Sequence, residues 1–507
     1  MMTDLPGEPD PVFSWLVEIV NKFTSRGSVY LVGGAVRDLL MHRPCHDLDF
    51  VLDGNVKSLA RKVADSIKGD FYMLDQERGT GRVIYYGPQA GRICLDFALL
   101  RAGNIEEDLR ARDFTVNAMA LDLRNPQVLI DPLGGILDLE AKTLRATSPN
   151  AFQNDPVRVL RGIRQALAFN FQLEPADRQA MQDAVPLLQS VSIERQRDEL
   201  FNMLEGSQVR SAIQMLDQLG VLHLILPELD DMKGVSQSAP HIYDVWEHTL
   251  ALLAQLEWLF EVLLGDFHES GAANPMLELA IMKLGRFRDQ WAEHFNQPVN
   301  PNRKLRGLLF LAGLYHDIDK PGNRQVSPDG RTHFIGHDAA GARTAAQRAQ
   351  YLALSQVEVQ RLETIVAEHM CIHQLAQSRQ APSRRAIFRY FRSTGPAGVD
   401  ICLFSLADTL ATYGTGLPQE TWLAELEVCR SLLEAWWEHP AEAVTPPRLV
   451  SGDDLLHAFD LNPGPLVGEL LAVIQEAQAS GEINDRPQAL EYAVKYLKGW
   501  RNDLPIG

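Results

Sequence analysis

The segment YLVGGAVRDLLMHRPCHDLDFV, residues 30–51, places the strongest constraint on the fold of this 507-residue chain. It predicts an apolar strand, a glycine turn at Gly33 and Gly34, a short helix, and a second strand carrying Asp47 and Asp49. Because side chains alternate along a strand, the two acids project to the same side. Paired carboxylates repel unless a cation lies between them, and hard divalent ions such as Mg²⁺ take oxygen ligands and bridge to phosphates. A glycine turn before a helix lets backbone N–H groups approach phosphate oxygens. These parts together indicate metal-dependent nucleotidyl transfer.

This segment and four later ones resemble the head and neck of class II tRNA nucleotidyltransferases and bacterial poly(A) polymerases, in the polymerase β superfamily. The resemblance implies an α+β fold, in which a nucleotidyltransferase head with a small mixed sheet precedes an all-helical neck, an HD domain and a tail. The later segments occur in the family's order: EEDLRARDFTVNAMALD (106–122), DPLGGILDLEAKTLRA (131–146), NDPVRVLRGIRQALAF (154–169) and SIERQRDEL (192–200).

Changes of pattern along the chain predict its domains. Within the first 140 residues, strands are predicted at VYLVGG, DLDFVLD, RVIYYG, RICLDFALLR and AMALDL, separated by glycine-rich turns. Helical periodicity follows from about Ala141. Two stretches, MKGVSQSAP (232–240) and HPAEAVTPP (439–447), interrupt the helices. The expected parts are an N-terminal helical extension (1–27), the head (28–145), a helical neck and RNA-binding domain (146–232), an HD metal-dependent phosphohydrolase-like domain (241–413) and a C-terminal helical region (414–507).

Composition limits the partners and the compartment. A net charge of −18 argues against an indiscriminate nucleic-acid binder, so an RNA enzyme must concentrate its positive charge locally. The five cysteines form no CxxC pair and suit a reducing compartment. The acidic, proline-rich start MMTDLPGEPDP is not a signal peptide, and the apolar runs are too short to span a bilayer. We expect a cytoplasmic protein without a membrane partner; the oligomeric state stays open.

The resemblance assigns the nucleotide contacts. Arg37 and Arg112 are expected to offset the triphosphate charge, since arginine pairs with phosphate in a bidentate, directional way. Asp113 and Asn117, four residues apart in an expected helix, share a face that suits the ribose. Asp96, in the strand-like segment LDFALL, is either a third carboxylate of the metal site or an ordinary strand acid.

Base selection is assigned to Asp155 and Arg158, which match the acid and the arginine that act as a protein template in this family. Three residues apart on one expected helix face, they offer an acceptor and a donor to the edge of C or A. The family pattern is EDxxR, and Asn154 stands here in place of the glutamate. The alternative is an exposed ion pair without this role. The loop DQERGTGR (75–82) stands where relatives carry a flexible loop that assists the switch from C to A addition. Its charge and glycine content suit such a mobile element, and they also suit an ordinary surface hairpin.

Arginines on one broad helical side are the expected contacts for the RNA acceptor end. Phosphate contacts of this kind position a substrate without reading its sequence. The residues are Arg158, Arg161 and Arg164, joined by Arg195 and Arg197. A second cluster, SRRAIFRYFR (383–392), interleaves Arg385, Arg389 and Arg392 with aromatic residues; it is either a base-stacking surface or ordinary core packing.

A second constellation resembles the HD phosphohydrolase superfamily. Imidazole and carboxylate ligands from separate helices hold divalent or transition metals. The pattern HDIDKP departs from the usual HDxGKP, with Asp319 in place of glycine. The expected ligands of a divalent metal, whose identity stays open, are His248, His316, Asp317 and Asp408, and a two-metal site would add imidazoles from His337, His369 and His373.

The resulting expectation is a template-independent nucleotidyltransferase acting on an RNA 3′ end, with tRNA CCA addition from CTP and ATP as the leading case. With Mg²⁺ at Asp47 and Asp49, the RNA 3′-hydroxyl attacks the α-phosphate in a two-metal-ion reaction. An A-adding enzyme, a CC-adding enzyme and a poly(A) polymerase remain alternatives on the same head. From other classes, the alternatives are an HD metal phosphohydrolase with a nucleotide-binding head and a non-catalytic RNA-binding protein.

Overall fold

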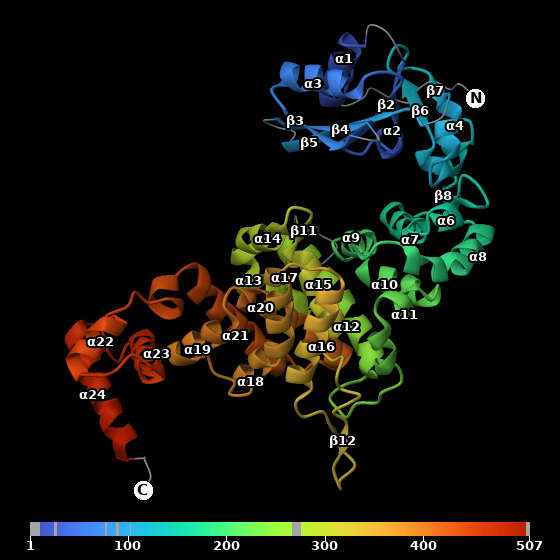
Figure 1. Ribbon diagram of the computed structural model, residues 1–507. Coiled ribbons are helices and arrows are strands. Elements are labelled where there is room, and N and C mark those ends of the chain that lie inside the picture. Colours follow the sequence, from blue (N-terminus) through green and yellow to red (C-terminus); the bar gives the residue numbers. More distant parts are fainter. Residues whose placement is uncertain are drawn as a thin grey trace. The chain divides into compact units, whose positions relative to one another are not determined.

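The computed structural model describes residues 11–24, 28–76, 79–87, 91–101, 103–265 and 275–502. An N-terminal sheet is followed by a long succession of helices, so the α+β expectation is confirmed (Figure 1). The described chain forms two compact units. The first runs to Gln196 and includes Gln218–Val221; the second comprises Arg197–Asp217 and the chain from Leu222. The bounds of the five parts expected from the sequence stay a prediction.

The head contains a seven-stranded sheet. Its order is β3-β4-β5-β2-β1-β6-β7, and β2 and β5 are its parallel pair. The strands β3 and β7 were not expected: β3 shows only a weak alternation, and β7 has two residues. The bounds are β1 Val29–Val32, β2 Asp47–Leu52, β3 Asp70–Asp75, β4 Thr80–Gly87, β5 Gly91–Leu99, β6 Ala120–Asp122 and β7 Leu129–Ile130.

The two faces of this sheet differ. Helices α1 (Pro11–Lys22), α2 (Gly34–Leu40) and α3 (Val56–Ile67) contribute to one apolar core with the face that carries Leu48 and Phe50. Helix α4 (Ile105–Arg110) packs on part of the other face, against Val32 and Val51. Because side chains alternate, Asp47 and Asp49 lie on this second face, which is otherwise open.

The rest of the chain is mainly helical, with three short strand pairs that the sequence did not predict: β8 (Thr143–Leu144) with β9 (Gln172–Leu173), β10 (Pro298–Asn300) with β11 (Arg303–Lys304), and β12 (Gln325–Val326) with β13 (Thr332–His333). The helices are α5 Gly135–Glu140, α6 Ala151–Asn154, α7 Arg158–Phe169, α8 Pro175–Ala184, α9 Ile193–Leu204, α10 Val209–Gln218, α11 Val221–Ile225, α12 Val245–Leu259, α13 Pro275–Leu284, α14 Arg288–Asn296, α15 Leu305–Tyr315, α16 His337–Tyr351, α17 Gln356–Glu368, α18 Cys371–Ala376, α19 Arg384–Thr394, α20 Ala397–Tyr413, α21 Gln419–Trp437, α22 Gly452–Phe459, α23 Pro465–Ala479 and α24 Arg486–Asn502.

Two buried helices position the second constellation. Every residue of α20 from Ala397 to Thr412 is buried, which is typical of a helix that is surrounded by others. Helix α15 is almost as apolar and leads directly into His316. Asp244 caps the start of α12 by accepting from the backbone N–H of Glu247, and this fixes the helix that carries His248.

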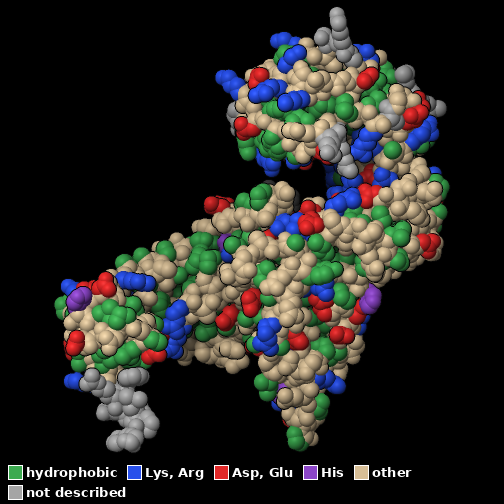
Figure 2. All heavy atoms as spheres, in the orientation of Figure 1, with side chains coloured by type: hydrophobic (Ala, Val, Ile, Leu, Met, Phe, Trp, Pro, Cys, Tyr) green, Lys and Arg blue, Asp and Glu red, His purple; other side chains and the backbone are tan. Residues whose placement is uncertain are grey.

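The surface is mixed in charge. Acidic side chains are interspersed with lysine and arginine over the visible face (Figure 2), in keeping with a net charge of −18. Among the described residues, no helix is long and apolar enough to cross a membrane.

Candidate active sites

A cavity of about 540 Å³ lies in the first unit, and many of the residues assigned from the sequence line it. Its walls combine carboxylates with several guanidinium groups, as a site for a triphosphate and a cation requires. Asp47 and Arg197 are not among the lining residues. The predicted site residues that line it are Gly33, Gly34, Arg37, Asp49, Asp96, Arg112, Asp113, Asn117, Asp155, Arg158, Arg161, Arg164 and Arg195.

Asp49 is one of the acids that line this cavity. Although solvent reaches its side chain, the surrounding protein removes enough water to raise the pKa of Asp49 to about 6. Arg112 opposes this shift, whereas the charges of Asp96 and Asp47 add to it. Oxygen donors on one sheet face, with a carboxylate that is costly to ionise, fit a hard divalent cation such as Mg²⁺.

Asp96 lies directly opposite Asp49 on the neighbouring parallel strand. Both its oxygens accept hydrogen bonds from Arg82, at 2.7 and 2.6 Å, in a bidentate pair. Asp96 therefore adds negative potential beside Asp49 while its own oxygens are engaged. Arg82 ends the predicted loop 75–82; Glu77 and Arg78 of that loop lie outside the described residues.

The glycine turn has a steric basis at Gly33. Its φ of 76° lies in the left-handed region, and it caps the start of α2. A Cβ atom at this position would lie 2.8 Å from Nη1 of Arg112. Gly33 thus allows the guanidinium of Arg112 to approach the backbone beside Asp49.

Arg37 is buried and held by three groups. It donates to Asp38 (2.9 and 2.7 Å) and to Oδ1 of Asn117 (2.7 Å), and its guanidinium lies 4.0 Å from the ring centre of Phe169. Burial lowers the pKa of Arg37, which the charge of Asp38 partly offsets. Arg37 is therefore a fixed positive charge in the cavity wall.

Asp113 and Asn117 converge, although the helix expected for them is wrong. Asp113 precedes a 3₁₀ turn, Thr115–Asn117, and its Oδ1 accepts from the side chain of Asn117 at 3.0 Å. Burial raises the pKa of Asp113, but Arg161 at 3.1 Å and the hydrogen bonds of Asn117 and the Phe114 N–H hold it below its usual value. A bend and a 3₁₀ turn, and not an α-helix, bring the side chains of Asp113 and Asn117 together.

Asp155 and Arg158 do not share one helix, which corrects the expectation for residues 154–169. Helix α6 ends at Asn154, Asp155 is extended, and α7 begins at Arg158. Asp155 accepts from Arg195 at 2.8 Å, and Arg158 donates to the carbonyl of Ala111 at 2.7 Å. Both side chains still line the cavity, whereas the exposed Asn154 does not.

The other predicted RNA contacts separate into two sets. Arg161, Arg164 and Arg195 line the head cavity. Arg197 belongs to the second unit, where it donates to Asp198 and to the carbonyl of Ala353. The RNA-binding role of these four residues stays a prediction.

The arginines of the α19 cluster form ion pairs with an acidic side chain. Arg385, Arg389 and Arg392 all lie near Glu476. The interleaved rings, Phe388, Tyr390 and Phe391, are buried. They are core residues, so the base-stacking alternative for this cluster is wrong.

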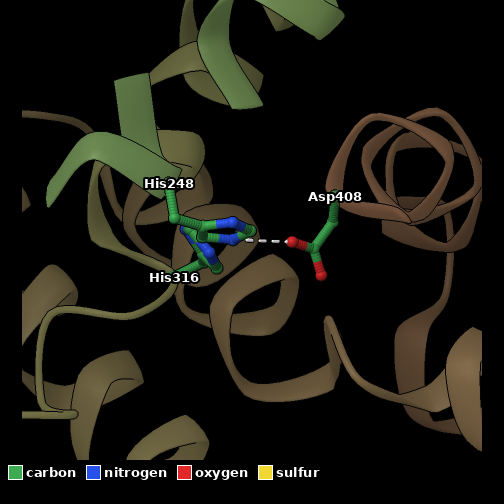
Figure 3. A group of neighbouring side chains, drawn as sticks. All are labelled: His248, His316 and Asp408. Atoms are coloured by element: carbon green, nitrogen blue, oxygen red, sulfur yellow. Dashed lines mark ion pairs between the residues drawn. The ribbon is translucent and has the colours of Figure 1, made fainter. Parts of the chain in front are cut away.

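The second unit brings the HD residues together in two groups whose potential ligand atoms lie within 4.8 Å of one another. The first group is His248, His316 and Asp408, and Figure 3 shows Asp408 pointing from its helix toward the two imidazoles. The second group is Asp317, His337 and His369.

Several buried polar atoms in this cluster lack a hydrogen-bond partner. His248 Nε2 and Asp408 Oδ1 are 2.9 Å apart (dashed in Figure 3), but the geometry is not that of a hydrogen bond. Unsatisfied buried atoms are costly unless an ion or a water molecule binds them. The orphaned atoms are His248 Nδ1 and Nε2, His316 Nε2, Asp317 Oδ2, His337 Nε2 and Asp408 Oδ1, and this N/O set fits divalent metal ions.

The ring orientation of three imidazoles is set locally. Nδ1 of each lies near the carbonyl three residues earlier: 2.9 Å for His316, and 2.7 Å for both His337 and His369. The remaining nitrogen, Nε2, is left to bind an ion. Burial, with the charge of His316, lowers the pKa of His369 to about 3, so its ring is neutral, as a ligand must be.

His373 has different surroundings. Its Nε2 is 2.8 Å from Oδ2 of Asp408, and its Nδ1 is 2.8 Å from Oε1 of Glu425. Burial alone lowers the pKa of His373, but Glu425 and Asp408 raise it to about 10. The ring therefore keeps both protons, which argues against the expected use of His373 as a metal ligand.

A cavity of about 760 Å³ opens beside the HD cluster and includes residues that the sequence pattern did not single out. The ammonium of Lys320 lies 2.6 Å from Oδ2 of Asp317 in an ion pair without hydrogen-bond geometry, and Glu425 pairs with His373. The lysine of HDIDKP was a visible signal, whereas Glu425 lies far from any motif. Asp319 accepts from Thr344 at 2.6 Å without a positive φ, so the missing glycine does not distort the turn.

Family models match both parts of the chain that carry these two clusters. The Poly A polymerase head domain matches residues 29–145 and the HD domain matches 283–412. The family described as "Probable RNA and SrmB- binding site of polymerase A" matches residues 170–233, and the family described as tRNA nucleotidyltransferase domain 2 matches residues 446–494.

Two curated relatives align along almost the whole chain. An A-adding tRNA nucleotidyltransferase of Deinococcus radiodurans is 34% identical over 481 residues, 94% of this chain and 96% of the relative. A CC-adding tRNA nucleotidyltransferase of Geobacter sulfurreducens is 30% identical over 466 residues, 92% and 91% of the two chains. The chain belongs to the tRNA nucleotidyltransferase family and is a nucleotidyltransferase.

Solved structures share the fold. A CCA-adding enzyme in complex with ATP aligns with a TM-score of 0.60 at 19% identity, covering 96% of both chains. The Thermotoga maritima CCA-adding enzyme complexed with tRNA aligns with a TM-score of 0.54 at 20% identity, covering 98% of this chain and 99% of that one.

Proposed function

We propose that this chain adds nucleotides to the 3′ end of tRNA, with CTP and ATP as donors and complete CCA addition as the leading case. The observation that carries the proposal is the head cavity, where the desolvated Asp49 faces a wall of guanidinium groups. An acid that ionises reluctantly beside an anion-binding wall suits a cation and a triphosphate bound together.

Each part of the cavity has a proposed role. Asp47 and Asp49 would hold Mg²⁺, which when bound supplies the charge that activates the RNA hydroxyl and stabilises the leaving pyrophosphate. Arg37 and Arg112 offset the triphosphate charge. Asp155 and Arg158 present an acceptor and a donor to the base, because a carboxylate and a guanidinium keep spare hydrogen-bonding capacity beyond the contacts described above.

A second candidate is one partial reaction, addition of A alone or of CC alone. It is favoured because the relatives that align over more than nine-tenths of this chain are named A-adding or CC-adding enzymes. The motifs of the head do not separate these reactions.

Extension of three tRNA acceptors tests these proposals. The acceptors lack CCA, CA or the final A, and each is incubated with Mg²⁺ and labelled CTP, ATP or both. Growth of all three to mature length supports CCA addition; growth of only the last, by A, supports the A-adding reaction. No incorporation, or incorporation undiminished by Asp47→Asn with Asp49→Asn, overturns the nucleotidyl-transfer site.

We further propose that the HD cluster binds two divalent ions and hydrolyses phosphoesters. Its support is the set of orphaned buried donor atoms beside an open cavity. Hydrolysis of p-nitrophenyl phosphate esters with Mn²⁺ is expected to survive loss of Asp47 and Asp49 and to vanish in His316→Ala. Hydrolysis that persists in His316→Ala would refute this assignment.

A further inference from the structure

We propose that His373 and Glu425 are positioning residues that orient Asp408 toward the first metal-ligand group of the HD cluster. This inference rests on the proposed metal site. Both residues come from outside the two ligand groups: His373 lies on α18 and Glu425 on α21.

The two oxygens of Asp408 have separate surroundings. Oδ1 points to His248 Nε2 at 2.9 Å and has no hydrogen-bond partner, so it is the oxygen available to an ion. Oδ2 lies 2.8 Å from Nε2 of His373. The carboxylate is therefore divided between an ion-facing side and a side bound to protein.

His373 is fixed in turn by Glu425. Both nitrogens of the ring lie 2.8 Å from a carboxylate oxygen, so the ring is held between Glu425 and Asp408 and both nitrogens are engaged by protein side chains. Glu425 is itself buried, and its second oxygen accepts from Ser405 at 3.0 Å. The chain of contacts runs from Ser405 through Glu425 and His373 to Asp408.

This chain of contacts touches one ligand group only. Asp408 belongs to the group with His248 and His316, whereas the second group is built on Asp317 and imidazoles anchored to backbone carbonyls. Outer partners that orient a ligand typically contribute 10- to 100-fold to metal affinity. A substitution that breaks these contacts should therefore weaken the binding of one ion and leave the binding of the other unchanged as an internal reference.

The test measures Mn²⁺ binding to the full-length, metal-free protein by calorimetry, with Asp47→Asn and Asp49→Asn present so that the head does not contribute. Electron paramagnetic resonance of the same samples shows whether two neighbouring ions are bound. We expect two ions in this background. Glu425→Gln and His373→Gln should each lower the affinity for one of the two ions by about tenfold or more, while the stoichiometry stays at two. The double variant should lower this affinity little further.

The matched control is Glu427→Gln, which removes a carboxylate from the same helix, where it pairs with Lys283 and Arg430. It should bind both ions as the parent does. If circular dichroism shows that Glu425→Gln does not fold, the positioning role is tested with His373→Gln alone. Unchanged affinities in a folded variant, or a stoichiometry of one in His373→Gln, overturn the inference. A parent that binds no Mn²⁺ overturns the proposed metal site as well.

Discussion

Asp49 and Asp96 stand directly opposite each other on the two parallel strands of the head sheet, and Arg82 is clamped to the second of them. The guanidinium of Arg82 thus offsets the charge of Asp96, whereas it makes no such pair with Asp49. This imbalance makes the site responsive to pH and to cations.

Asp49 makes the stability of the first unit without metal depend on pH, and the test uses protein with His316→Ala and Asp317→Asn so that the HD cluster does not contribute. Its pKa rises from 3.8 to about 6 on folding, so the folded state holds the proton more tightly than the unfolded state. The Asp49 contribution to the free energy of unfolding is therefore fully present below the lower value and is lost as pH rises through about 6. Added Mg²⁺ should raise the melting temperature more at about pH 8 than at about pH 5. Asp49→Asn should remove both effects, and Asp70→Asn, an exposed acid of the same sheet, should remove neither.

Arg82→Gln should move the acid limb of the nucleotidyl-transfer pH profile upward. Without Arg82, the full charge of Asp96 acts on Asp49 and raises its pKa further, by roughly half a unit. The measurement is the initial rate of nucleotide incorporation against pH at fixed Mg²⁺. Adding Asp96→Asn to Arg82→Gln should restore the profile. The charge-matched control is Arg92→Gln, which removes an arginine four residues before Asp96 on β5. An unchanged limb in Arg82→Gln contradicts the prediction.

Arg161→Gln should destabilise the first unit. It leaves the buried Asp113 carboxylate without the guanidinium at 3.1 Å, and because Arg161 is itself part-exposed we expect a loss of about 2 kcal/mol. The pKa of Asp113 is depressed, so this stabilisation is present above its unfolded value and lost as pH falls through the folded one. Urea unfolding near neutral pH measures the effect. Asp113→Asn combined with Arg161→Gln should recover part of the loss; a double variant less stable than the single one would contradict this account.

Divalent ions should stabilise the second unit through the HD cluster. Mn²⁺ at a hundredfold excess over its dissociation constant is expected to add about 2.7 kcal/mol to the free energy of unfolding. Thermal unfolding with and without a chelator, in protein lacking the head acids, measures the gain. His316→Ala should remove the part of the gain that comes from the group of His248, His316 and Asp408, whereas replacement of the exposed His457 by Gln should leave the whole gain.

The sequence predicted the parts of the head that depend on local pattern. Alternation along residues 47–52 fixed which face Asp49 occupies, and the glycine pair matched a backbone conformation that the structure requires at Gly33. The family's order of motifs predicted that Asp113, Asn117, Asp155 and Arg158 meet, and they line one cavity.

The elements that carry those residues were less predictable. An i,i+3 or i,i+4 spacing suggests a helix, yet Asp113 stands before a 3₁₀ turn and Asp155 in a break between helices. Contacts with Arg161 and Arg195, distant in sequence, stabilise these irregular conformations, and a local pattern does not contain them. Strand β3 was missed because its pairing with β4, and not a strong apolar run, maintains it.

Three imidazoles of the HD cluster, those of His316, His337 and His369, take their orientation from carbonyls three residues back in the same segment. Each of these ligands carries its own alignment wherever its helix is placed, and no remote side chain is needed to set the ring. Asp408 has no such local anchor. Substitutions in α21 would therefore disturb the orientation of Asp408 before that of these imidazoles. In a relative that kept the fold but no longer hydrolysed phosphoesters, we expect the contacts that orient this carboxylate to be lost first.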